Sequence, residues 1–121
     1  MAAGLDDYLA ELLEPLGGVT TRRMFGGIGL FHDGLMFAIV IRDVLHFKTD
    51  PETRPAFEAE GCAPFSYVAG ERTVELSYWR APERLLDEPD AFLDWARTAV
   101  AVARRAEATR KAPRRPKKPT A

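Results

Sequence analysis

Few side chains in this sequence are of types that carry out chemistry, and none of them stands at the spacing of a catalytic motif. His32 adjoins a turn and His46 lies in an apolar stretch, and neither has a nucleophile or metal-ligand partner at motif spacing. Cys62 is the single cysteine, so the chain can form neither an internal disulfide nor a multi-cysteine metal cluster. Ser66 and Ser77 lack the strand-turn-helix context of a nucleophile elbow. We therefore expect a protein that is not an enzyme and that has no catalytic residue, metal or cofactor.

A glycine-rich stretch over residues 24–38 is the most unusual part of the sequence. Gly26-Gly27-x-Gly29 is not a phosphate-binding loop, because it lacks the Lys-Ser/Thr pair and leads into a strand rather than a helix. Asp33-Gly34 lies between two apolar runs and predicts a two-residue type I′ hairpin turn. The glycines before that turn predict a bulge, a strong twist or the close approach of another element.

The formal net charge of −1 conceals a strong asymmetry. From residue 104 onward the chain has eight of its 17 basic residues and one of its 18 acidic residues, a net charge of +7. The first 103 residues therefore hold nine basic and 17 acidic residues, a net charge of −8. Such a basic segment can bind phosphate polymers, whereas the acidic body should repel DNA.

The last residues, 106–121, mix Lys, Arg, Pro and Ala without apolar periodicity, which predicts a disordered tail. Pro113, Pro116 and Pro119 are spaced by three, a pattern compatible with polyproline II and with binding to aromatic grooves or to nucleic acid. Any contact with DNA would be electrostatic and independent of base sequence. The residues predicted to make it are Arg104, Arg105, Arg110, Lys111, Arg114, Arg115, Lys117 and Lys118.

Apolar periodicity predicts an α+β domain over residues 1–105, with one antiparallel five-stranded sheet, helices packed on it and the order α-β-β-β-α-β-β-α. The helices are expected at 5–16, from about 50 to 61, and from about 89 to 103. The strands are expected at 24–31, 35–41, 44–48, 65–68 and 73–78, and residues 36–41 form the central strand, covered on more than one side. The predicted core includes Leu30, Met36, Ile39, Leu76, Phe92 and Trp95.

Two features predict an interface. Tyr78 and Trp79 are adjacent in a strand and should point to opposite faces, which leaves Trp79 as the interface candidate. Arg22 and Arg23 could form a basic spot with Arg80 near the edge of the sheet.

The length of 121 residues and the 46% hydrophobic content suit a single domain with a modest core. The N-terminus lacks the basic flank and apolar run of a signal peptide, and no segment approaches the length of a membrane span. With one cysteine, the chain suits a reducing compartment, and we expect a soluble cytoplasmic protein.

Residues 5–105 resemble the N-terminal domain of the TfoX/Sxy family of competence regulators. The landmarks that carry the resemblance follow the order of that family: Met24-Phe25-Gly26-Gly27-x-Gly29-Leu30-Phe31-x-x-Gly34-x-Met36-Phe37-Ala38, Leu45-x-x-Lys48-x-Asp50, Arg54-x-x-Phe57, Gly61, Pro64-Phe65-x-Tyr67, Val74-x-Leu76-x-Tyr78, Pro82 and Leu93-x-Trp95-Ala96.

The resemblance implies a secretion-chaperone-like fold and a regulatory role in natural competence, in which the protein helps a cyclic-AMP receptor protein to activate genes for DNA uptake. Full-length members carry a second, helical domain, where this sequence has its short basic tail. The alternative is a small stand-alone binding domain or homodimer of unrelated role, whose tail binds nucleic acid non-specifically. Neither hypothesis involves a membrane.

Overall fold

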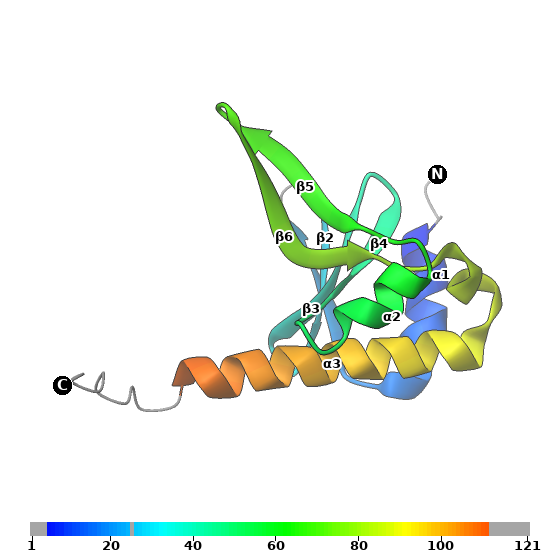
Figure 1. The fold of residues 1–121 in the computed structure, drawn as a ribbon. Helices are drawn as coiled ribbons and strands as arrows, with labels where there is room; N and C mark the ends of the chain where they lie inside the picture. Colours follow the sequence, from blue (N-terminus) through cyan, green and yellow to red (C-terminus); the bar gives the residue numbers. More distant parts are fainter. Residues whose placement is uncertain (1–4, 25, 112–121) are drawn as a thin grey trace.

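The computed structural model describes residues 5–24 and 26–111, which form one sheet with helices on one of its faces (Figure 1). The elements in chain order are α1 (Leu5–Leu13), η1 (Glu14–Leu16), β1 (Val19–Met24), β2 (Gly27–His32), β3 (Leu35–Ile41), β4 (Val44–Lys48), α2 (Arg54–Ala59), β5 (Pro64–Ala69), β6 (Arg72–Arg80), η2 (Glu83–Asp87) and α3 (Pro89–Lys111). The predicted α+β class is confirmed. No helix in the described ranges is long and apolar enough to cross a membrane.

The sheet has six strands in the order β1-β2-β3-β4-β6-β5, so the prediction of five strands was wrong. The additional strand is β1, which pairs antiparallel with β2 along its whole length. Its four central side chains are exposed and only Val19 and Met24 are half-buried, so it lacks the apolar alternation that marks a strand in a sequence. Backbone pairing at a sheet edge, rather than side-chain burial, makes this segment a strand.

Two tight turns fold β2, β3 and β4 into a meander. Asp33 and Gly34 have φ values of 54° and 81°, as the predicted type I′ turn requires. Arg42 and Asp43 join β3 to β4 with φ values of 53° and 63°. Two consecutive residues with side chains are therefore held in the left-handed region that favours glycine.

The predicted close approach at the glycines of β2 is confirmed. A Cβ atom on Gly27 would lie 2.1 Å from the backbone oxygen of Val40 in β3. A Cβ atom on Gly29 would meet the Sδ atom of Met36 at 2.8 Å. The register between β2 and β3 also shifts between Leu30 and Phe31, but the extra residue is Phe37 of β3, so the bulge lies after the turn and not among the glycines, where it was one of the expectations.

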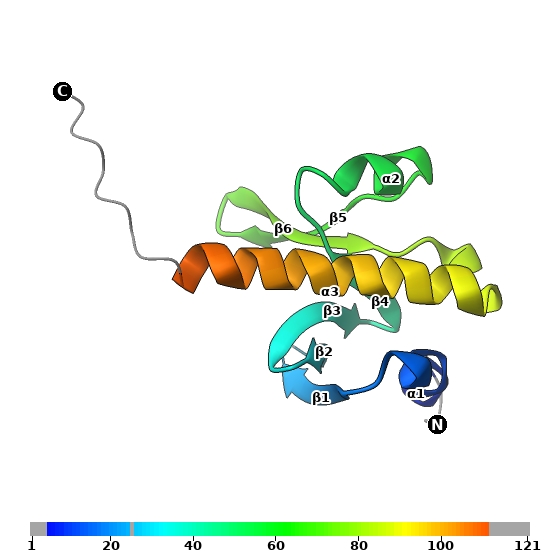
Figure 2. The same cartoon turned by 90° about the horizontal axis from the view of Figure 1, so that it is seen from below.

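The main core lies between the sheet and the helices. Figure 2 shows α3 crossing the sheet, with α1 and α2 on either side of it. Phe37 of β3, Phe47 of β4 and Phe92 of α3 are at most 1% exposed and form its centre. Of the predicted core residues, Leu30, Ile39 and Phe92 are buried, whereas Met36, Leu76 and Trp95 are half-buried.

Helix α3 continues to Lys111, beyond the boundary predicted after residue 105. Residues 106–111 are therefore helical, although they were predicted to be disordered. An ion pair between Glu107 and Arg110, three residues apart, supports this last part of the helix together with two alanines. The rest of the predicted tail, residues 112–121, lies outside the described residues.

Candidate interaction surface

The face of the sheet opposite the core contains an apolar groove of about 550 Å³. Because side chains alternate along β3 after its bulge at Phe37, Ala38 and Val40 lie in the core, whereas Ile39 and Ile41 lie on the other face. We call this concavity the sheet groove. It is lined by Met36, Ile39 and Ile41 of β3, Phe65 and Tyr67 of β5, and Leu76, Ser77 and Tyr78 of β6.

Curling of the sheet brings the walls of the sheet groove together. β4 lies between β3 and β6 in the strand order, yet the hydroxyl of Tyr78 in β6 donates a hydrogen bond of 3.2 Å to the carbonyl of Met36 in β3. Burial raises the pKa of Tyr78 to about 12, so the phenol stays protonated as a donor. The Nζ atom of Lys48 lies 5.0 Å from the centre of the Tyr78 ring.

His46 lies beside the sheet groove and has a structural role. Its ring is 6% exposed and meets the Phe65 ring edge-on, with 5.4 Å between the centroids. The Nδ1 atom lies 3.0 Å from the carbonyl of Val44, so it donates the hydrogen bond. Burial lowers the pKa of His46, against the opposing effect of this carbonyl, and the ring is therefore neutral at pH 7.

The groove has the chemistry of a binding surface. Carbon-rich side chains line it, and the polar atoms that Tyr78 and His46 carry are engaged with backbone carbonyls. Burial, together with the carboxylate of Glu60, raises the pKa of the Cys62 thiol, which disfavours the reactive thiolate. Among the described residues, no three His, Cys, Asp or Glu side chains are grouped to hold a metal ion. This surface suits an apolar binding partner or ligand.

The three arginines of α3 that were predicted to contact nucleic acid, Arg104, Arg105 and Arg110, each lie beside an acid. Arg104 lies 3.4 Å from the Asp33 carboxylate, and Arg110 pairs with Glu107. Lys111 is the last residue of α3. The other predicted contacts, Arg114, Arg115, Lys117 and Lys118, fall outside the described residues, so the binding role of the whole set stays a prediction.

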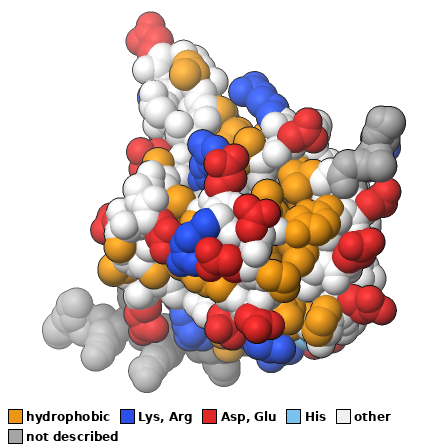
Figure 3. Space-filling view, turned by 90° about the vertical axis from the view of Figure 1, so that its right-hand side faces the viewer, with side chains coloured by type: hydrophobic (Ala, Val, Ile, Leu, Met, Phe, Trp, Pro, Cys, Tyr) orange, Lys and Arg blue, Asp and Glu red, His pale blue; other side chains and the backbone are white. Residues whose placement is uncertain are grey.

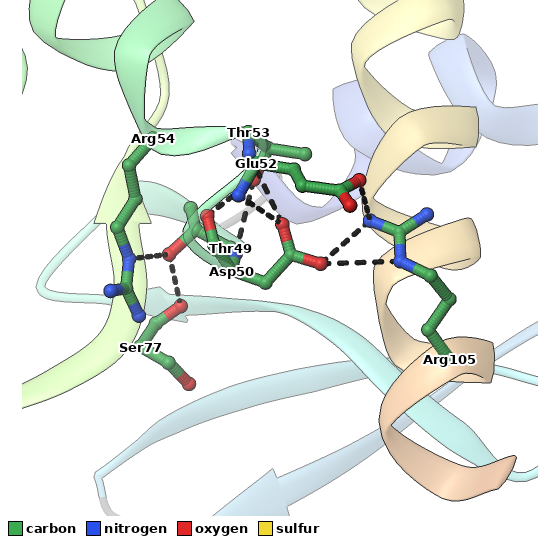
Figure 4. A network of polar contacts seen from close by, with 7 residues as sticks. All are labelled: Thr49, Asp50, Glu52, Thr53, Arg54, Ser77 and Arg105. Atoms are coloured by element: carbon green, nitrogen blue, oxygen red, sulfur yellow. Dashed lines mark hydrogen bonds and ion pairs between the residues drawn. The ribbon is translucent and has the colours of Figure 1, made fainter. Parts of the chain in front are cut away.

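Arg105 forms the most extensive of these contacts and ties α3 to the segment between β4 and α2 (Figure 4). Its guanidinium donates two hydrogen bonds to one oxygen of Asp50, at 2.6 and 3.2 Å, and lies 3.8 Å from Glu52. The other carboxylate oxygen of Asp50 accepts the backbone N–H groups of Glu52 and Thr53. Burial alone would raise the pKa of Asp50, but these hydrogen bonds and the charge of Arg105 hold it below its usual value.

A second set of contacts in Figure 4 fixes the same segment to β6. The backbone N–H and the hydroxyl of Thr49 both donate to the carbonyl of Ser77, at 2.7 and 2.9 Å, and Arg54 donates to the Thr49 hydroxyl. Ser77 is also part of the sheet groove. The polar network therefore holds a groove-lining strand and helix α3 in one arrangement.

The predicted interface residues occupy three different places. Trp79 points to the core side, where its ring meets Phe57 at 6.2 Å, while Tyr78 points into the groove, as the alternation predicted. Arg22 is exposed on β1, 4.9 Å above the Phe31 ring, and Arg23 is exposed beside it. Three strands separate β1 from β6, so the predicted spot of Arg22, Arg23 and Arg80 is not formed on neighbouring strands. The unexpected strand β1 carries the two arginines to the far edge.

One end of the molecule is strongly acidic. Figure 3 shows the side where α1, η2 and the start of α3 meet, with acidic side chains spread around an apolar area. The exposed acids of these elements include Glu11, Glu83, Asp87, Glu88 and Asp90. Such a surface repels the phosphate backbone of DNA and attracts a basic protein.

Comparison with known proteins identifies a family and a curated relative. The family model described as the TfoX N-terminal domain matches residues 11–103. A curated relative, the DNA transformation protein TfoX1 of Aliivibrio fischeri, is 28% identical over 96 residues, which cover 79% of this chain and 46% of the relative. The chain thus spans less than half the length of that relative.

Proposed function

This chain belongs to the TfoX N-terminal domain family, and on that premise we propose that it is a non-enzymatic regulatory domain that binds a protein partner through the sheet groove. The observation that carries the proposal is the groove itself: about 550 Å³ of apolar concavity on the face of the sheet that lies opposite the helix-covered core. Exposed apolar surfaces mark sites that bind a protein or an apolar ligand, and we take the occupant here to be the side chains of a protein partner.

The proposed role is in the expression of genes for DNA uptake, with a transcription factor of the cyclic-AMP receptor protein type as partner. Two observations support this role: the family of the chain, and the name of its relative, a DNA transformation protein. The net charge of −8 on residues 1–103 favours a basic protein surface over DNA as the first contact. This chain matches 46% of the length of that relative, so a role of the whole relative is carried over here only as a proposal.

Affinity capture from the native cell, with and without nuclease, tests the proposal. The groove variant is Leu76→Asp, which adds a charge to the apolar wall, and the matched control is Thr73→Asp, which adds the same charge to an exposed site on β6 outside the groove lining. Circular dichroism establishes that both variants fold. We expect a receptor-protein-type factor to be captured by the unchanged chain and by the control, to resist nuclease, and to be lost with Leu76→Asp. Loss on nuclease treatment, or equal capture by Leu76→Asp, would contradict the proposal.

The absence of catalysis is tested separately. We expect no turnover of generic esterase, phosphatase or nuclease substrates by the purified chain, since its buried histidine is neutral and its thiol is disfavoured as a thiolate. An activity that disappears on changing His46 or Cys62 to alanine would overturn this part of the proposal.

A further inference from the structure

Strand β5 is an open edge of the sheet. It is the last strand in the order β1-β2-β3-β4-β6-β5, and among the described strands it pairs only with β6. Its last four residues, Ser66 to Ala69, are all exposed. Figure 1 shows the β5–β6 hairpin extending away from the helices, so within the described chain nothing covers this edge.

The side chains of this edge are unusual for a surface strand. Three large hydrophobic residues are exposed among the described residues, and two of them are Tyr67 and Val68, which are 45% and 71% exposed. No residue of β5 is charged, and its one proline stands at the first position. Natural proteins usually protect an edge strand with charges, bulges or prolines, because an unprotected edge pairs with another strand.

The other edge of the sheet is protected. β1 carries the adjacent arginines Arg22 and Arg23, both exposed and without an acid in the same strand. Antiparallel pairing of β1 with a second β1 would bring these like charges close together, at an energetic cost. The two edge strands therefore differ in charge: β1 carries two arginines that oppose pairing with a second β1, whereas β5 carries no charge that would oppose pairing.

The β5 strand of a second copy of this chain fits the β5 edge better than residues 112–121 of the chain do. Around a two-fold axis the uncharged β5 meets itself, so no like charges approach, and apart from Ser66 its side chains are apolar or aromatic. Residues 112–121 match this edge less well by sequence, because their three prolines lack the backbone N–H that strand pairing uses.

We propose that the chain forms a two-fold dimer in which β5 pairs antiparallel with β5 of a second copy. The sheet then continues across the axis and covers Val68. Phe65 and Tyr67 belong both to β5 and to the sheet groove, so the dimer places two grooves next to each other at the axis. This interface goes beyond the proposed function and does not depend on the identity of a partner.

Sedimentation velocity over a range of concentrations tests the dimer. The interface variant is Val68→Lys, which places like charges near the axis at a site too exposed to disturb the fold. The matched control is Thr20→Lys on the opposite edge, where the side chain is also exposed. We expect the unchanged chain and Thr20→Lys to sediment with twice the mass of one chain, and Val68→Lys to sediment as a monomer with an unchanged circular dichroism spectrum.

Hydrogen exchange of the unchanged chain locates the contact without any substitution. The amides of β5 should be protected at concentrations at which the dimer forms and should exchange faster on dilution, while those of β1 stay the same. Three results would overturn the proposal: a monomer at all concentrations, a Val68→Lys variant that remains dimeric, or a polymer that keeps growing with concentration, as head-to-tail pairing of β5 with β1 would produce.

Discussion

Replacing Gly27 by alanine should be among the most destabilising single-methyl changes in this protein. The added Cβ would lie 2.1 Å from the Val40 oxygen and 3.1 Å from the Val40 carbonyl carbon. Carbon and oxygen atoms normally approach no closer than about 3.3 Å, so β2 and β3 would have to separate by about 1 Å. Both atoms are backbone of a buried strand, which cannot swing aside as a side chain does.

The expected cost follows from this geometry. Overpacking in a well-packed core costs about 1–3 kcal/mol, and a clash with backbone belongs at the upper end. Alanine also lowers the conformational entropy of the unfolded chain, which stabilises the folded state by about 0.4–1 kcal/mol. The net decrease in the free energy of unfolding is therefore about 2 kcal/mol. Since small domains are stable by roughly 5–15 kcal/mol, this loss is easily measured by urea unfolding.

Gly29→Ala is the matched control, in the same strand. Its Cβ would meet the Met36 and Met24 sulfur atoms at 2.8 and 3.0 Å and the Phe31 ring edge at 3.0 Å, all of them in side chains that can rotate away. We expect it to cost less than about 1 kcal/mol. A Gly27→Ala variant within about 0.5 kcal/mol of the unchanged chain, or no difference between the two variants, would refute the reasoning.

Three further outcomes are expected. Trp95→Ala should cost about 2 kcal/mol in chemical denaturation, less than a fully buried ring, because the side chain is half-buried against Phe57. Folding lowers the pKa of both His46 and Asp50, so each contributes stability that is lost on acidification. The contribution of neutral His46 should be complete above pH 6.5 and be lost as the pH falls below it, and that of Asp50 should be lost below about pH 4. In pH-dependent unfolding, His46→Asn and Asp50→Asn should each flatten the stability profile in its own pH range. The full chain should bind duplex DNA weakly and with a steep dependence on salt, and cutting it after Lys111 should abolish this binding, because the arginines that remain on α3 face acids. Equal binding of DNA by the full and the shortened chain at low salt would assign the contact to residues 1–111.

Local signals in the sequence predicted the structure well where a few neighbouring residues decide it. Asp33-Gly34 predicted a turn through its backbone preferences, and apolar periodicity predicted the helix that begins near residue 89. Strand β1 was missed because an edge strand with exposed side chains has no apolar pattern to detect. The same reason explains why residues 106–111 were predicted to be disordered: an exposed helix end held by alanines and an ion pair has no periodicity.

The sheet groove could not be predicted, because it depends on contacts between distant segments. The apolar residues 36–41 predicted a strand covered on both faces, but not that the second face is a concavity closed by β5 and β6. Similarly, the basic residues near position 104 suggested free charges, whereas Arg105 meets Asp50, 55 positions away in the sequence. Such pairings follow from the curl of the sheet and the path of α3, and no short sequence pattern encodes either.

The turn between β3 and β4 offers a route to a more robust version of this protein. Arg42 and Asp43 both have positive φ, a conformation that costs a residue with a side chain about 1–2 kcal/mol. Asn-Gly is the pair that such a turn favours, and neither position lines the sheet groove. The double change Arg42→Asn, Asp43→Gly should therefore supply a stabilised background in which disruptive groove and edge variants still fold, so that their effects on binding can be separated from their effects on folding.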